Sequence, residues 1–201
     1  MRLFLCSHFS SVGSAVEEQI AGKKVLFIPT ASIHEGYTGY VGSARKLFKK
    51  AGALLTEIDI STEEFSKIKT LFDDADVIYF TGGNSFFLID CLRKTGTDKL
   101  LKRQLEKGKL FIGESAGAII ASHNVEYGQI MDDRSVAAEL EDCSGLGLVD
   151  YCVLPHNGEF PFVEAAAETI ARYGEKLNLV PLNNREAVVV DGNGYSVRLE
   201  G

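Results

Sequence analysis

The stretch Leu110-Phe-Ile-Gly-Glu-Ser115-Ala-Gly-Ala-Ile-Ile120 joins a short apolar run to a Gly-x-Ser-x-Gly pentapeptide. The apolar run is typical of a buried strand, and the residues after the serine suit the start of a helix. A sharp strand-to-helix turn lifts one side chain out of the sheet, while the flanking glycines let neighbouring backbone pass close beneath it. The first N–H groups of the helix then point toward the serine oxygen. The stretch predicts a nucleophile at Ser115, and the alternative is a tight turn with an incidental serine.

Short apolar runs alternate with amphipathic segments along the rest of the chain. Several runs are solid blocks of Val, Ile, Leu and Phe, as expected for strands that helices cover on both faces. The alternating order through residue 122 predicts an α/β fold with a doubly wound, mainly parallel sheet. Turn residues between Val188 and Val197 predict an antiparallel hairpin at the end of that sheet. The expected strands are 2–6, 25–28, 54–58, 77–80, 110–112, 151–154, 179–181, 187–190 and 195–199, and the expected helices are 12–20, 39–51, 63–69, 85–93, 98–107, 116–122 and 162–173.

Composition narrows the class of protein. The 201 residues contain no linker, repeat or low-complexity stretch, so we expect one domain over residues 1–201. The net charge of −7 argues against nucleic acid or an anionic membrane surface as a partner. No apolar run approaches the roughly 18 residues that span a bilayer, and the apolar N-terminus is short enough to be a first strand. The four cysteines form no C-x-x-C pair, so we expect free thiols, no metal site and a cytoplasmic protein.

Polar residues follow several of the predicted strands. In open α/β sheets, functional groups gather outside the carboxyl ends of the strands. A serine nucleophile needs a base, and His8, His34 and His156 all follow strands. His123 is a poor candidate because it lies eight residues beyond Ser115, roughly 12 Å along a helix at about 1.5 Å per residue. Spacing alone does not choose among the other three histidines.

The segment Thr81-Gly82-Gly83-Asn84 lies between a predicted strand and a helix. Such a turn could cradle a phosphate, but it lacks both G-x-G-x-x-G and a Walker lysine. It could also form an oxyanion hole, in which a glycine N–H and the N–H of Ala116 hold the developing negative charge. The second interpretation fits if the strand before Thr81 neighbours the strand before Ser115.

Four segments occur in this order along the chain: Phe80-Thr-Gly-Gly-Asn-Ser-Phe86, Gly113-Glu-Ser-Ala-Gly-Ala118, Leu154-Pro-His156 and Arg185-Glu186-Ala187. Together they resemble the peptidase E (α-aspartyl dipeptidase) family of serine peptidases. The resemblance covers nearly the whole chain, and it implies a class I glutamine amidotransferase-like fold without a metal or organic cofactor. It also implies Ser115 as nucleophile, His156 as base and Glu186 as the acid that orients it, with Gly83 and Ala116 at the oxyanion.

The acid has alternatives. The family has also been discussed with an aspartate downstream of the serine, where Asp132 and Asp133 stand here, although a solvated loop is the simpler interpretation of that segment. An α/β-hydrolase would instead place the acid between the serine and the histidine. The late hairpin and the Gly-Gly-Asn loop favour the order Ser115, His156, Glu186.

One departure concerns the substrate. The family typically has a Gly-Glu-Thr-Arg-like stretch after the histidine, whereas this chain continues from His156 as Asn-Gly-Glu-Phe-Pro, without an arginine. An aspartyl side chain needs a cation, for which Arg134, Arg172 and Arg185 are candidates. We therefore expect a serine peptidase for short peptides, with N-terminal Asp as one substrate class, acting as a monomer or homodimer. The alternatives are an esterase or amidase, including a cyanophycinase-like enzyme, and a non-catalytic binding domain. Residues expected near the substrate are Gly82, Asn84, Asn157 and Glu159.

Overall fold

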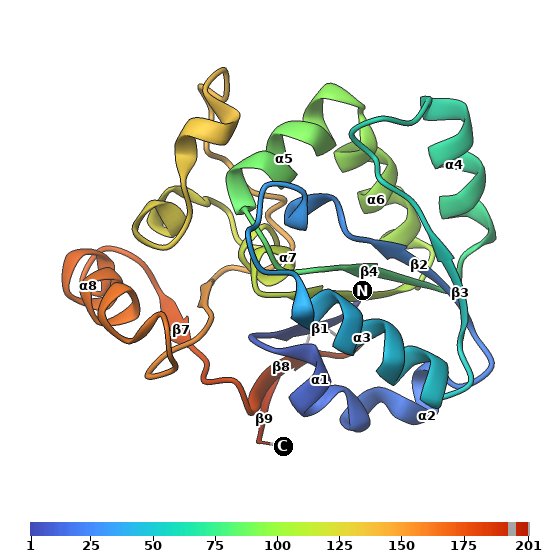
Figure 1. The fold of residues 1–201 in the computed structure, drawn as a ribbon, viewed down its shortest axis with the longest axis horizontal. Coiled ribbons are helices and arrows are strands. Elements are labelled where there is room, and N and C mark those ends of the chain that lie inside the picture. The colour runs from blue at the N-terminus through green and yellow to red at the C-terminus, as the bar shows by residue number, and fades with distance from the viewer. Residues whose placement is uncertain (193–195, 201) are drawn as a thin grey trace.

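The computed structural model describes residues 1–192 and 196–200, and a seven-stranded sheet runs through its centre (Figure 1). Its strand order is β3-β2-β4-β5-β1-β8-β9. The first five of these strands are parallel, and β8 and β9 continue the sheet in antiparallel pairing. This confirms the predicted α/β class with its antiparallel end. The strands are β1 (Arg2–Cys6), β2 (Lys24–Ile28), β3 (Leu54–Glu57), β4 (Val77–Phe80), β5 (Leu110–Glu114), β8 (Glu186–Val190) and β9 (Ser196–Glu200).

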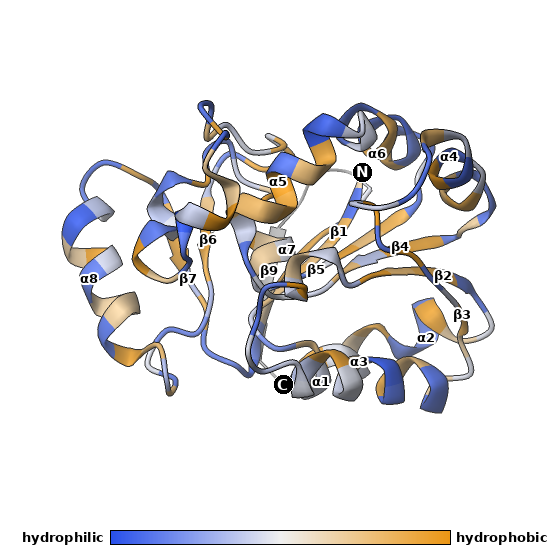
Figure 2. Cartoon of the chain, turned by 45° about the horizontal axis from the view of Figure 1, so that its top comes forward, coloured by the Kyte–Doolittle hydropathy of each residue, from blue (hydrophilic) through white to orange (hydrophobic). Residues whose placement is uncertain are grey.

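Helices cover both faces of the sheet, whose strands are coloured mostly as hydrophobic (Figure 2). Buried apolar residues form one core cluster on each face. Alternate residues of β1 enter opposite cores, because Leu3 and Leu5 face one side and Phe4 and Cys6 the other. One core lies under α1 (Phe9–Val12), η1 (Gly13–Val16), α2 (Glu17–Ile20) and α3 (Gly39–Lys50). The other lies under α4 (Phe65–Asp74), α5 (Ser85–Lys94), α6 (Thr97–Glu106) and α7 (Ala116–Ile119).

The four cysteines are free and buried in these cores. In the described part of the chain, no helix has the length and apolar character needed to cross a membrane.

The predicted helix over residues 12–20 is divided into α1, η1 and α2. At the division, Gly13 packs closely against α3, and a Cβ there would lie 2.9 Å from the Leu47 side chain.

A second, two-stranded parallel sheet stands apart from the main one. It pairs β6 (Cys152–Leu154) with β7 (Leu179–Pro181), which α8 (Val163–Tyr173) connects. The sequence predicts both strands but not their separation from the main sheet. Since β5 is already paired with β4 and β1, and β1 with β5 and β8, no position beside the Ser115 strand is open to β6.

The chain between α7 and β6 is irregular, with short turns η3 (Glu126–Ile130) and η4 (Arg134–Ala137), and a further turn η2 (Thr30–Ser32) follows β2. The predicted C-terminal hairpin is present as the antiparallel pair β8–β9, while residues 193–195 of its turn lie outside the described residues. The strand order brings the ends of β4, β5 and β1 together at one edge. The candidate site lies at that edge.

Candidate active site

Ser115 stands at the sharp turn that the sequence predicts between β5 and α7. Its φ of 49° and ψ of −107° are unusual for a residue with a side chain. The flanking glycines are required by contact, because a Cβ on Gly113 would lie 2.4 Å from the Gly117 carbonyl oxygen, and one on Gly117 would lie 2.6 Å from that of Phe80. The Ser115 N–H donates to the Cys6 carbonyl at 2.8 Å. The turn is therefore held by neighbours on both sides and leaves the hydroxyl partly exposed.

His156 reaches this hydroxyl from the loop after β6. Its Nε2 lies 2.9 Å from Ser115 Oγ. The residue has a φ of 61°, and its backbone N–H donates to Ser7 Oγ at 3.1 Å. The Ser7 hydroxyl in turn donates to the Leu182 carbonyl at 2.9 Å, and the imidazole stacks on Phe162 with ring centroids 4.8 Å apart. Of the histidines that the sequence left open, the structure places His156 next to the serine.

The other ring nitrogen of His156 faces Asn184, two residues before the glutamate that the resemblance implies as the acid, Glu186. His156 Nδ1 lies 2.7 Å from Asn184 Oδ1. The Glu186 carboxylate accepts the Asn183 N–H at 2.7 Å, and the Glu186 N–H donates to the Asn183 carbonyl at 3.2 Å. Glu186 begins β8, so its buried side chain closes the turn before the strand. That turn presents Asn184, two residues earlier, to the histidine.

This arrangement sets the protonation of His156. When Asn184 Oδ1 accepts the Nδ1–H, the Nε2 atom is left as the acceptor for the serine hydroxyl. Burial lowers the pKa of His156, although the hydrogen bond to Asn184 raises it in part. Because the pKa lies below the ordinary 6.5, the imidazole is neutral at pH 7 and able to take a proton.

The Gly82-Gly83 loop lies beside Ser115, as the predicted pairing of β4 with β5 requires. Gly83 has a φ of 128°, and a Cβ there would lie 2.1 Å from the Ala31 carbonyl oxygen, so only glycine fits. Among the described residues, the N–H groups of Gly83 and Ala116 have no hydrogen-bond acceptor. Two free donors therefore stand on the loops that border the serine.

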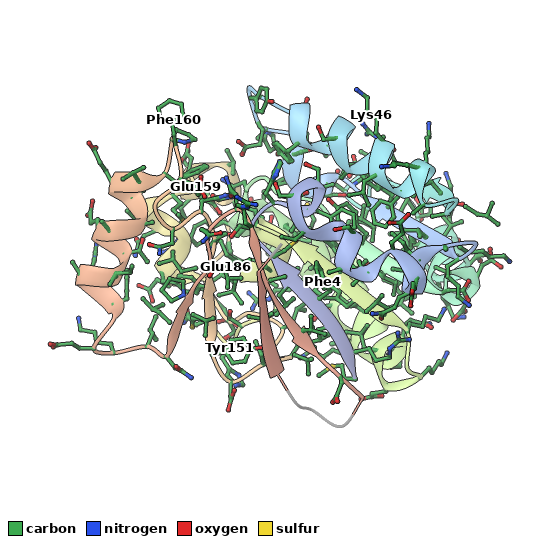
Figure 3. All side chains as sticks on the ribbon, turned by 90° about the horizontal axis from the view of Figure 1, so that it is seen from below. Phe4, Lys46, Tyr151, Glu159, Phe160 and Glu186 are labelled. Carbon is green, nitrogen blue, oxygen red and sulfur yellow. The ribbon has the colours of Figure 1, made fainter. Side chains whose placement is uncertain are left out.

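Acidic and basic groups surround the histidine. Glu159 Oε1 accepts the Asn184 N–H at 3.3 Å. The charge of Glu159 raises the pKa of both His8 and His156, while burial lowers both pKa values more strongly. Glu159 lies on the inner side of the loop that follows β6, and Phe160 projects from its outer tip (Figure 3).

Several other predicted residues have structural partners. Asn84 caps α5 by accepting the Phe87 N–H at 3.0 Å, and its amide donates to the Asp133 carbonyl at 2.8 Å. Asp132 accepts the Ser85 N–H at 2.8 Å and the Ser85 hydroxyl at 2.5 Å, so it holds the start of α5; burial raises its pKa to about 6. Asp133 is exposed and caps η4. The Asn157 N–H donates to the Leu182 carbonyl at 2.9 Å.

The candidate arginines differ in their surroundings. Arg134 lies over the Phe86 ring at 5.9 Å and donates to the Leu140 carbonyl at 3.3 Å. Arg172 lies over the Tyr173 ring at 5.5 Å on α8. Arg185 is exposed and directly follows Asn184, which makes it the candidate cation nearest in sequence to the site.

Two residues at the site were missed from the sequence. Asn184 belongs to the polar run after β7, and Glu114 is the one charged residue within the buried β5. A charge in an otherwise apolar strand is a signal that the sequence does carry. Within the described residues, no group of three or more His, Cys, Asp or Glu side chains is arranged to hold a metal ion.

The fold and site together define a class: α/β proteins with a serine-histidine pair at the carboxyl edge of a parallel sheet and free N–H groups beside it. The chain belongs to peptidase family S51, whose model matches residues 5–198. Its relatives include the uncharacterised peptidase Lmo0363 of Listeria monocytogenes, 42% identical over 193 residues that make up 94% of each chain. Another is PM1590 of Pasteurella multocida, 40% identical over 98% of this chain and 97% of that one.

Relatives and solved structures named peptidase E are also similar. A peptidase E of Nostoc is 30% identical over 67% of this chain and 52% of its own length. A crystal structure of a candidate peptidase E from Listeria monocytogenes has a TM-score of 0.94 at 39% identity and covers 100% of this chain and 98% of its own. The structure of a peptidase from an acI-B1 Actinobacterium, at 21% identity and a TM-score of 0.74, shares the fold.

Proposed function

We propose that the protein is a serine peptidase that cleaves short peptides through an acyl-enzyme. The carrying observation is the 2.9 Å contact between Ser115 Oγ and His156 Nε2 on a strained turn. Family membership supports the peptidase class, and the contact supports serine as its nucleophile.

In the proposed reaction, Ser115 Oγ attacks the scissile carbonyl carbon while His156 Nε2 takes the hydroxyl proton. The carbonyl oxygen becomes an oxyanion, which the N–H groups of Gly83 and Ala116 bind. Collapse of this intermediate breaks the C–N bond, and His156 returns its proton to the leaving amine. A water molecule then attacks the acyl-enzyme with His156 again as base, which releases the acid and restores Ser115.

Asn184 takes the role that a carboxylate has in most triads. Its amide oxygen fixes the tautomer and the ring orientation of His156, as the asparagine of papain-like Cys-His-Asn sites does. A neutral amide stabilises the imidazolium less than a carboxylate would. Glu159 adds a negative charge behind it, because it holds the Asn184 N–H and raises the pKa of His156.

The same carboxylate supports a preference for short peptides. Glu159 lies beside the catalytic pair and is partly exposed, so we propose that it binds the α-ammonium group of the substrate. Arg185 is the cation that we propose for a substrate carboxylate, because it is exposed and directly follows Asn184, whereas Arg134 and Arg172 lie over the rings of Phe86 and Tyr173. An N-terminal Asp preference would depend on Arg185.

Labelling with a fluorophosphonate probe tests the nucleophile. The wild type should form a Ser115 adduct, and Ser115→Ala should form none; equal labelling of the two proteins would refute the proposal. A panel of Asp-Ala, Ala-Ala, N-acetyl-Ala-Ala and p-nitrophenyl acetate then separates peptidase from esterase. Loss of activity on the acetylated peptide would support α-ammonium binding, and Glu159→Gln should remove that discrimination.

A further inference from the structure

Glu114 directly precedes the proposed nucleophile, and its carboxylate lies beneath the turn. The side chain is 1% exposed. The ion pairs among the described residues do not include it, so hydrogen-bond donors rather than a cation stabilise its charge. A buried carboxylate without a cation is costly unless several donors satisfy it. The hydrogen-bond donors around the Glu114 carboxylate therefore indicate its role.

Donor groups from the ends of two other strands, β1 and β4, converge on this carboxylate. The Phe9 N–H, at the start of α1 after β1, donates to Oε1 at 2.7 Å. The Tyr79 hydroxyl, on β4, donates to Oε2. The backbone N–H of Gly82, in the loop after β4, faces the carboxylate and in part lowers the pKa of Glu114. Glu114 thus joins the ends of β1, β4 and β5 under the site.

The contact with Gly82 bears on the oxyanion hole. The Gly82 N–H faces Glu114, and the Thr81 hydroxyl donates to the Gly82 carbonyl at 2.9 Å. In a trans peptide the N–H of the next residue points opposite to that carbonyl. Fixing both sides of Gly82 therefore fixes the direction of the Gly83 N–H. The same loop is close to the nucleophile, since a Cβ on Gly82 would lie 3.1 Å from Ser115 Cβ.

We propose that Glu114 is a positioning residue, which holds the Gly82-Gly83 loop so that the Gly83 N–H binds the oxyanion. This inference rests on the proposed function. Glu114 does not touch the substrate and acts through Gly82. Glu114 should therefore stabilise the transition state more than the bound peptide, because the oxyanion is present in the transition state and absent from the bound peptide.

A carboxylate suits this place better than the amide of the same size. The Phe9 and Gly82 N–H groups can only donate, and the two carboxylate oxygens provide enough lone pairs for both and for Tyr79. In Glu114→Gln one of those oxygens becomes an NH₂ donor. The substituted amide would then face the Phe9 N–H, or it would reverse the hydrogen bond with the Tyr79 hydroxyl, and in either case no negative charge would remain to attract the Gly82 N–H.

The test compares Glu114→Gln with wild type on the dipeptide that the wild type cleaves fastest. We expect kcat to fall about tenfold to a hundredfold, less than or equal to the loss from deleting an oxyanion donor. The Ki of the matching trifluoromethyl ketone, which forms an oxyanion on the serine, should rise by a similar factor. KM and the Ki of the product amino acid should stay within about twofold of the wild-type values, since neither the bound substrate nor the product carries an oxyanion at the Gly83 N–H.

Ile68→Val is the matched control, because Ile68 is fully buried on α4 and its truncation lowers stability without touching the site. It should leave kcat and the trifluoromethyl ketone Ki unchanged. If Glu114→Gln lowers the melting temperature as Ile68→Val does and leaves both constants within twofold, Glu114 is only structural and the inference is wrong.

A second variant covers the case in which Glu114→Gln does not fold. Tyr79→Phe keeps the ring and removes one donor from Oε2, so it should weaken trifluoromethyl ketone binding in the same direction by a smaller factor. Unchanged binding in that variant would overturn the inference. Fluorophosphonate labelling of the wild type distinguishes failure of the proposed function from failure of the inference about Glu114. An unlabelled Ser115 contradicts the proposed function and the inference with it, whereas a labelled Ser115 with unchanged constants in the variants contradicts the inference alone.

Discussion

Replacing Asn184 by Asp tests the proposed triad most directly, because it changes the charge next to His156 and little else. The substitution keeps the size of the side chain and an oxygen at the position 2.7 Å from Nδ1. A carboxylate there favours the protonated imidazole, so the pKa of His156 should rise. The wild type has the opposite bias, since burial lowers that pKa.

The size of the shift follows from the geometry. Charge centres about 4 Å apart at an effective dielectric constant of about 20 attract by about 4 kcal/mol. At 1.36 kcal/mol per pKa unit, this is an upper bound of about 3 units. Both side chains are partly exposed, so solvent screening reduces the expected shift to about 1–2 units.

The assay is the pH dependence of kcat/KM, which reports the free enzyme. Neutral His156 is the active base, so a raised pKa moves the acidic limb of the profile to higher pH by about 1–2 units. At pH 9, where the base is neutral in both proteins, Asn184→Asp should be at least as fast as wild type, because its carboxylate stabilises the imidazolium.

Asn183→Asp is the matched control, because it adds the same charge one residue away, where the side-chain oxygen accepts the Arg185 N–H instead. Its acidic limb should move by less than half as much. The triad assignment would be refuted if Asn184→Asp left the limb in place, or if the two variants moved it equally.

Three further predictions concern the nucleophile, its loop and the carboxylate beneath it. Ser115→Ala should lower kcat/KM by about four orders of magnitude or more while keeping the fold, as shown by an unchanged circular dichroism spectrum. Gly83→Ala should lower the free energy of unfolding by about 3 kcal/mol or more in urea titrations, because its Cβ would lie 2.1 Å from the Ala31 oxygen at a φ of 128°. Burial raises the pKa of Glu114 from 4.5 to about 7, so the folded state holds this proton more tightly than the unfolded chain. As the pH rises from 4.5 to 7, the unfolding free energy of the wild type should therefore fall relative to that of Glu114→Gln. Parallel plots of unfolding free energy against pH for the two proteins would contradict this.

The sequence predicts the sheet and the turn at Ser115 well because both depend on local patterns. Solid apolar runs mark β4 and β5, and the pentapeptide around Ser115 needs two glycines for contacts that the structure contains. The pairing of β4 with β5 also follows from general topology. The site of Gly83 beside Ser115 then follows without knowledge of any distant contact.

The partner of His156 could not be predicted in the same way. The sequence places Asn184 and Glu186 two residues apart, and a carboxylate is the more frequent partner of a catalytic histidine. What separates them is the turn before β8, where Glu186 closes a local hydrogen bond to Asn183 and enters the sheet. The separate sheet of β6 and β7 is likewise set by which edges of the main sheet are already occupied.

The site is held against local backbone preference by contacts distant in sequence. Ser115 and His156 are the two residues other than glycine with positive φ among the described residues, and each such conformation costs about 1–3 kcal/mol. Long-range hydrogen bonds oppose this cost: Cys6 holds the Ser115 N–H, and Ser7 holds the His156 N–H. Both anchors lie at the end of β1, the strand that pairs with the Ser115 strand on one side and with β8 on the other. The end of β1 therefore aligns nucleophile and base, so changes there should reduce activity before they unfold the protein.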